Sequence, residues 1–96
     1  MRIGPIGKPE FFIRGMTNTG ILLLSANQFR FYSLITNDSN VKIWIFFGRQ
    51  NVFGEGIPIL GNGFAFEIDS NNMYRGDVYG IHGSSGTKNI AVFDGS

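Results

Sequence analysis

Apolar and polar residues alternate in short runs along most of the chain, and segments rich in Gly, Asn and Ser separate these runs. Alternation with a period of two is typical of β-strands, and here the alternating runs follow one another about every ten residues. This spacing is typical of an all-β domain. No segment repeats apolar residues at helical spacing. The sequence therefore predicts a small antiparallel β-sandwich or a jelly-roll-like barrel. The predicted strand segments are 21–28, 29–37, 41–48, 57–63 (broken by a Gly-Asn-Gly turn), 64–69, 78–83 and 88–94.

Two turns predict which strands are neighbours. Residues 37–40 read NDSN, and the Asn and Asp side chains of such a turn can bond their own backbone. We expect this turn to join segments 29–37 and 41–48 into a hairpin. Residues 83–87 read GSSGT, and we expect the strands on either side of this turn to form a closing pair.

The beginning of the chain has a different composition. The residues that resist regular structure there are Gly4, Pro5, Gly7 and Pro9. The apolar run Phe11, Phe12 and Ile13 follows and could serve as a first strand or as an anchor. We expect residues 1–15 to form an extended arm and residues 16–96 to form a single β-sandwich domain. An extended segment of this kind can add to the sheet edge of a neighbouring subunit.

The segment VKIWIFFG (41–48) is apolar on both faces of its predicted strand. One face carries Val41, Ile43, Ile45 and Phe47, and the other carries Lys42, Trp44 and Phe46. Because an uncovered aromatic face is an aggregation hazard, Trp44 and Phe46 need a cover. We predict a partner interface formed by Phe11, Phe12, Ile13, Trp44 and Phe46. The alternative is a cover supplied by a loop or by the arm of the same chain.

Composition and charge narrow the class of protein. The chain has 96 residues and ten Phe, which is a large supply of aromatic side chains for one small domain. The formal charge is +1 and the basic residues are scattered, which argues against binding to nucleic acid. The absence of Cys removes disulfides and thiolate metal ligands. Neither a transmembrane run nor the apolar core of a signal peptide is present, so we expect synthesis in a cytoplasm and no membrane partner.

The residue types that often carry catalysis are dispersed. His82 is the only histidine, and no Cys or second His can share a metal with it. We interpret it as a strand histidine with an ordinary hydrogen bond. Ser84 or Ser85 could combine with His82 and Asp77 into a nucleophilic triad, but none of them lies in the context of a nucleophile elbow.

Two carboxylates lie close together in segment 64–69. Glu67 and Asp69 are two residues apart, which would place both on one face of a strand. A glycosidase pair requires a cleft and a defined separation, so we interpret these residues as part of a solvated face. Asp69 and Asn71 match the start of a calcium loop but lack its glycine and its final glutamate, which favours a turn. The sequence therefore predicts no catalytic residue, no metal, no cofactor and a protein that is not an enzyme.

Four segments in order carry a resemblance to a known class of proteins. In RFYSLITNDSNVKIWIFFG (30–48), an Arg precedes an apolar strand, an Asn-rich turn follows, and the next strand ends in Phe-Gly. The continuation consists of GIPILGNGF (56–64), GDVYGI (76–81) and IAVFD (90–94). Together they resemble small all-β virion proteins of tailed bacteriophages, over about the last three-quarters of the chain.

The resemblance implies a structural role without catalysis. The expected protein is a capsid decoration (cement) protein that lies on the capsid surface of the virion and binds the major capsid protein. The resemblance also implies that it forms a homotrimer. The alternative is an accessory domain of a tail, baseplate or fibre that interacts with tail proteins. Such a domain would bind a receptor or carbohydrate through Trp44, Tyr74 or Tyr79.

Overall fold

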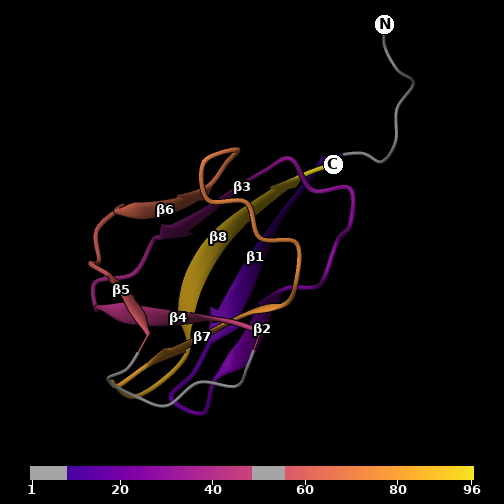
Figure 1. Ribbon diagram of the computed structural model, residues 1–96. Helices are drawn as coiled ribbons and strands as arrows, with labels where there is room; N and C mark the ends of the chain where they lie inside the picture. The colour runs from indigo at the N-terminus through magenta and orange to yellow at the C-terminus, as the bar shows by residue number, and fades with distance from the viewer. Residues whose placement is uncertain (1–8, 49–55) are drawn as a thin grey trace, which may run out of the picture.

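The computed structural model describes residues 9–48 and 56–96, which form eight strands and no helix. The strands are β1 (Glu10–Met16), β2 (Ile21–Leu24), β3 (Tyr32–Asn37), β4 (Ile43–Phe47), β5 (Ile57–Ile59), β6 (Ala65–Ile68), β7 (Val78–His82) and β8 (Lys88–Gly95). They form two antiparallel four-stranded sheets that pack against each other (Figure 1). Sheet 1 has the order β1-β8-β3-β6, and sheet 2 has the order β2-β7-β4-β5. The prediction of a small antiparallel all-β sandwich is confirmed.

Both predicted strand pairings are wrong. β3 pairs with β6 and β8 in sheet 1, whereas β4 pairs with β5 and β7 in sheet 2. The turn after β3 therefore crosses from one sheet to the other, and the turn between β7 and β8 does the same. The physical reason is burial, because these crossings let the apolar inner faces of consecutive strands meet across the core. A short polar turn is compatible with either arrangement.

The predicted boundary between arm and domain is also wrong. Residues 10–15 are not an arm, because they form most of β1 and pair with β8 of the same chain from Glu10 opposite Asp94 to Met16 opposite Lys88. The strand is held by its inward residues, since Met16 is fully buried and Phe12 packs against the core. Residues 1–8 of the predicted arm lie outside the described residues.

The core lies between the two sheets and is built from alternate positions of the strands. Its buried members are Met16, Leu23, Leu24, Ile35, Ile43, Ile45, Ile59, Ile68, Val78, Ile90 and Val92. Burying such side chains stabilises the fold by about 1.5–3 kcal/mol each. Gly80 in β7 allows this packing, because a Cβ at that position would lie 2.7 Å from Cδ1 of Leu23.

Candidate interaction surface

The five predicted interface residues lie on different parts of the molecule. Phe11 and Ile13 point away from the core on β1, with 66% and 53% of their surface exposed. Phe12, between them, points inward and is half-buried. Trp44 and Phe46 lie on β4 in the other sheet. The structure thus brings Phe11 and Ile13 together but does not bring the five residues into one interface.

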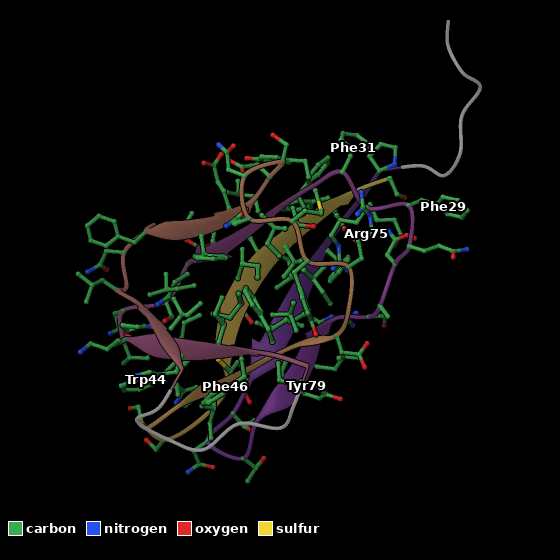
Figure 2. The ribbon with its side chains drawn as sticks, viewed as in Figure 1. Phe29, Phe31, Trp44, Phe46, Arg75 and Tyr79 are labelled. Atoms are coloured by element: carbon green, nitrogen blue, oxygen red, sulfur yellow. The ribbon has the colours of Figure 1, made fainter. Side chains whose placement is uncertain are left out.

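Phe46 is already buried within its own chain. Its side chain is 3% exposed, on the side of β4 that faces away from the core. Tyr79 lies opposite it in β7, and a Cβ on Gly56 would lie 3.0 Å from Cε2 and Cζ of its ring. Trp44 is half-buried, and Nζ of Lys42 lies 5.6 Å from the centre of its ring. Figure 2 shows Trp44, Phe46 and Tyr79 on the same side of the molecule.

A group of exposed and half-buried apolar side chains lies on the outer face of sheet 1. We call it the outer aromatic face, and it consists of Phe11, Ile13, Phe31, Tyr32, Leu34 and Phe93. The strand register places Phe93 between Phe11 on β1 and Leu34 on β3. Phe31, which is 61% exposed, extends this surface beyond the start of β3 (Figure 2). The sequence analysis identified only Phe11 and Ile13 of this group.

A glycine allows two of these rings to approach each other. A Cβ on Gly95 would lie 3.2 Å from Cζ of Phe31 and 3.2 Å from Cε2 of Phe93. The backbone N–H of Phe31 donates a 2.9 Å hydrogen bond to the carbonyl oxygen of Gly95. The ring of Phe93 also lies 6.2 Å from that of Tyr32, in a tilted arrangement. Phe31, Tyr32 and Phe93 therefore form one aromatic cluster.

A carboxylate borders this cluster on β6. The hydroxyl of Tyr32 donates a 2.6 Å hydrogen bond to Oε2 of Glu67. That hydrogen bond, together with partial burial and the negative charges of Glu67 and Asp69, raises the pKa of Tyr32 above its ordinary value. The pairing fixes the orientation of the tyrosine ring at the polar border of the face.

The second carboxylate of segment 64–69 has another role. β6 ends at Ile68, so the prediction that Asp69 shares a strand face with Glu67 is wrong. Oδ1 of Asp69 accepts a 2.8 Å hydrogen bond from the N–H of Asn71, and its own N–H donates to Oδ1 of Asn72 at 2.7 Å. The interpretation of Asp69 and Asn71 as a turn is confirmed.

His82 is fully buried in β7, and its ring has hydrogen-bond partners on both nitrogens. Nδ1 accepts from the N–H of Ser84 at 3.0 Å, which makes Nε2 the protonated nitrogen. Nε2 lies 3.0 Å from the carbonyl oxygen of Met16 and 2.9 Å from that of Gly86. The interpretation as a hydrogen-bonded strand histidine is confirmed. Asp77 instead accepts a 2.7 Å hydrogen bond from the N–H of Ala26.

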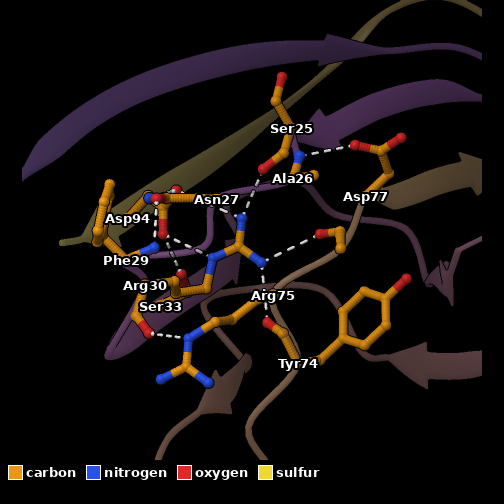
Figure 3. Close-up of polar contacts among 11 residues, drawn as sticks. Ser25, Ala26, Asn27, Phe29, Arg30, Ser33, Tyr74, Arg75, Asp77 and Asp94 are labelled. Carbon is orange, nitrogen blue, oxygen red and sulfur yellow. Dashed lines mark hydrogen bonds and ion pairs between the residues drawn. The ribbon is translucent and has the colours of Figure 1, made fainter.

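A buried ion pair that the sequence analysis missed lies behind the aromatic cluster. Arg30 is fully buried, and its Nε–H donates to Oδ1 of Asp94 at 2.8 Å. The other guanidinium hydrogen bonds are to Asp94 Oδ2 (3.4 Å), Ser25 O (2.7 Å), Tyr74 O (2.9 Å) and Gly76 O (3.1 Å), as Figure 3 shows. Asp94 lies in β8 of sheet 1, whereas Ser25 follows β2 and Gly76 lies in the loop before β7 of sheet 2. Arg30 therefore links sheet 1 to loop segments beside sheet 2 at one end of the sandwich. The only signal in the sequence was an Arg between two Phe.

The environment of Asp94 stabilises its charged form. Burial raises the pKa of this carboxyl, but hydrogen bonds from Arg30, Ser33 and Asn27 outweigh that effect, and the pKa lies below its ordinary value. The hydroxyl of Ser33 donates at 2.7 Å and the amide of Asn27 at 3.2 Å. With every donor of Arg30 and both oxygens of Asp94 in hydrogen bonds, we assign the pair a role in stability.

Two cavities open between the sheets at opposite edges of the sandwich. An apolar cavity of about 250 Å³ lies between β5 and β6 and is lined by Pro58, Ile59, Leu60, Phe64, Ala65 and Phe66. A more polar one of about 190 Å³ lies beside β1, and Glu10, Arg14, Asn27 and Asp94 contribute to its lining. Within residues 9–48 and 56–96, no group of three or more His, Asp or Glu side chains is placed to hold a metal ion. The same residues include no helix of the length and hydropathy that would span a membrane.

Comparisons of the chain with protein-family models, with curated proteins and with solved structures find no match.

Proposed function

We propose that this chain is a structural protein of a tailed-bacteriophage virion that decorates the capsid and binds across neighbouring capsid subunits. It is made in the host cytoplasm, acts on the capsid surface, and has the major capsid protein as its partner. The role requires no catalysis, because contacts across subunit boundaries resist the internal pressure of packaged DNA. The resemblance of segments 30–48, 56–64, 76–81 and 90–94 to small phage virion proteins supports this class.

The observation that carries the proposal is the outer aromatic face. A contiguous exposed apolar surface on a small domain marks an interaction site. Aromatic side chains supply about 150–250 Å² of contact area each and dominate the energetics of many interfaces. The chain also has a formal charge of only +1, which suits docking through apolar contacts. Many weak contacts repeated over a capsid would add up to strong adhesion.

The rings of this face are held in place before any partner binds. Phe31 follows the buried Arg30 directly, and its own N–H is bonded to Gly95. Phe93 precedes the buried Asp94, to which Arg30 is paired. Side chains that are already ordered lose less conformational entropy on binding. This arrangement supports a docking role for the aromatic cluster.

The second candidate function is an accessory domain of a tail, baseplate or fibre that binds a receptor or carbohydrate. The observation that favours it is the position of Trp44 and Tyr79 on one outer side of sheet 2, both half-buried (Figure 2). Tyr and Trp combine an apolar ring with a polar group, which suits a partly polar ligand. Tyr74 is less suited, because its ring stacks on Phe47 at 4.8 Å between centroids.

Sedimentation with expanded empty capsids tests the first proposal. The variant Phe31→Ser removes a ring of the outer aromatic face, and Phe64→Ser is the matched control, because Phe64 is 58% exposed and lies at the other end of β3 from Phe31. We expect the wild type and Phe64→Ser to bind equally, and Phe31→Ser to bind about tenfold more weakly or worse. Equal binding of the two variants, or binding to tails or cell-surface glycans in place of capsids, would overturn the proposal.

A further inference from the structure

β1 is the least protected sheet edge in the described part of the chain. It has seven residues, contains no Pro and pairs with β8 along one side. The other edges are shorter. β5 has three residues including Pro58, β6 has four residues, and β2 has four residues with a register shift between Leu22 and Leu24. Because short strands, proline and irregularities protect an edge, β1 is the edge most open to another strand.

The sequence of β1 is complementary to itself when it is read in the antiparallel direction. If Phe12 lies opposite Phe12 of a second copy, Glu10 lies opposite Arg14 and Phe11 lies opposite Ile13. By symmetry, each of these two contacts occurs twice. Opposite charges and large apolar residues are the cross-strand pairs that stabilise antiparallel sheets.

Neighbouring registers lack this match. If Phe11 lies opposite Phe11 of the second copy, Glu10 lies opposite Phe12. If Ile13 lies opposite Ile13, Arg14 lies opposite Phe12. A change of the pairing register by one residue would place the inner face of one strand on the same side as the outer face of the other. Pairing centred on Phe12 is the register in which both charges and both exposed apolar residues find partners.

The two charged side chains are placed to meet a second copy. They lie four residues apart, or about 13 Å along the strand, so they cannot pair within one copy. In the described residues, the side chain of Glu10 makes no hydrogen bond or ion pair, and Arg14 makes a 3.4 Å hydrogen bond from Nε to the carbonyl oxygen of Leu23. Arg14 also stacks on Phe12, with Cζ 4.3 Å from the centre of the ring. Arg14 and Glu10 both line the cavity beside β1.

From these observations we infer that β1 pairs antiparallel with β1 of a second copy of this chain, with the two-fold axis at Phe12. The two copies of sheet 1 then form one eight-stranded sheet. Phe11 and Ile13 contact each other across the seam, and the outer aromatic faces of both copies join into one continuous surface. Such an isologous contact closes as a dimer, in place of the trimer that the resemblance implies. The inference concerns the chain in solution and holds independently of capsid binding.

Analytical ultracentrifugation of the full chain over a concentration series tests the dimer. We expect Ile13→Lys, which places a charge opposite Phe11 of the second copy, to yield a monomer. Leu60→Lys is the matched control, because Leu60 is also 53% exposed but lies in the β5–β6 region. We expect it to remain a dimer. A wild-type monomer, a wild-type trimer, or an Ile13→Lys variant of unchanged mass would overturn the inference.

Charge reversal tests the register separately. Glu10→Arg or Arg14→Glu alone places like charges opposite each other twice, and we expect the dissociation constant to rise about 10- to 100-fold. The double variant with both reversals restores opposite charges in both contacts, and we expect it to dimerise as the wild type does. Circular dichroism of each variant shows whether it is folded. Single reversals that leave dimerisation unchanged, or a folded double variant that stays monomeric, would overturn the register.

Discussion

The Nε–H of Arg30 donates a 2.8 Å hydrogen bond to Oδ1 of Asp94, although the two residues are 64 positions apart in the chain. A ring of the outer aromatic face is adjacent to each residue in the chain, because Phe31 comes directly after Arg30 and Phe93 directly before Asp94. Successive side chains in extended backbone point to opposite sides. Because Asp94 points inward from β8, Phe93 points to the outer aromatic face, and the N–H of Phe31 is bonded to the neighbouring Gly95.

Replacing Asp94 by Asn should strongly destabilise the fold. The change leaves the buried guanidinium of Arg30 without its counter-charge, and removal of one partner of a buried pair costs about 3–5 kcal/mol. Urea denaturation followed by circular dichroism measures this as a fall in the free energy of unfolding. Asp38→Asn is the control, because Asp38 is exposed in the turn after β3. Equal unfolding midpoints for the two variants would contradict a stabilising role of the pair.

The stability of the protein should fall in acid because of Asp94. Its folded-state pKa lies below the ordinary value of 3.8, so between these two values the unfolded chain binds more protons than the folded one. The contribution of Asp94 is present well above pH 3.8 and is lost as the pH falls through the folded-state pKa. Thermal unfolding as a function of pH measures the decline. We expect a shallower acid decline in a folded Asp94→Asn variant than in Asp38→Asn, and parallel curves would speak against this assignment.

Replacing Asn37 by Asp tests the turn that crosses between the sheets. Asn37 is fully buried, and its Nδ2 donates to the carbonyl oxygens of Val41 at 2.8 Å and Ile59 at 3.0 Å. Aspartate has the same shape but would direct an oxygen toward both carbonyls, and unsatisfied buried groups cost about 1–3 kcal/mol each. We expect the melting temperature of Asn37→Asp to be lower than that of the wild type. The melting temperature of the exposed control Asn40→Asp should be unchanged. Similar melting temperatures for both variants would show that these hydrogen bonds are dispensable.

Truncation of two phenylalanines should separate a packing role from a surface role. Phe46 is 3% exposed and Phe31 is 61% exposed. We expect Phe46→Ala to reduce the free energy of unfolding by about 3–5 kcal/mol, as for other buried aromatic residues. Phe31→Ala should change it by no more than about 0.5 kcal/mol. Chemical denaturation of both variants provides the measurement, and a large loss for Phe31→Ala would mean that its ring supports the fold.

The polar turns illustrate what local sequence can predict. The Asx turn at Asp69 and the NDSN turn after Asn37 were both expected from residue type, and the structure confirms their side-chain hydrogen bonds. Such bonds join residues two positions apart, so they depend on local geometry alone. The same turns could not indicate which sheet the next strand would join, because that choice depends on how apolar faces meet across the core.

The sequence by itself determined the fold class, since alternation with a period of two and frequent turn residues are local properties that produce strands. It also indicated a surplus of aromatic side chains. Only the tertiary structure decided which of them are exposed. In the folded structure Phe46 is buried, Phe31 and Phe11 are exposed to solvent, and Arg30 forms an ion pair with Asp94. These outcomes depend on contacts between residues far apart in the chain, which periodicity does not encode.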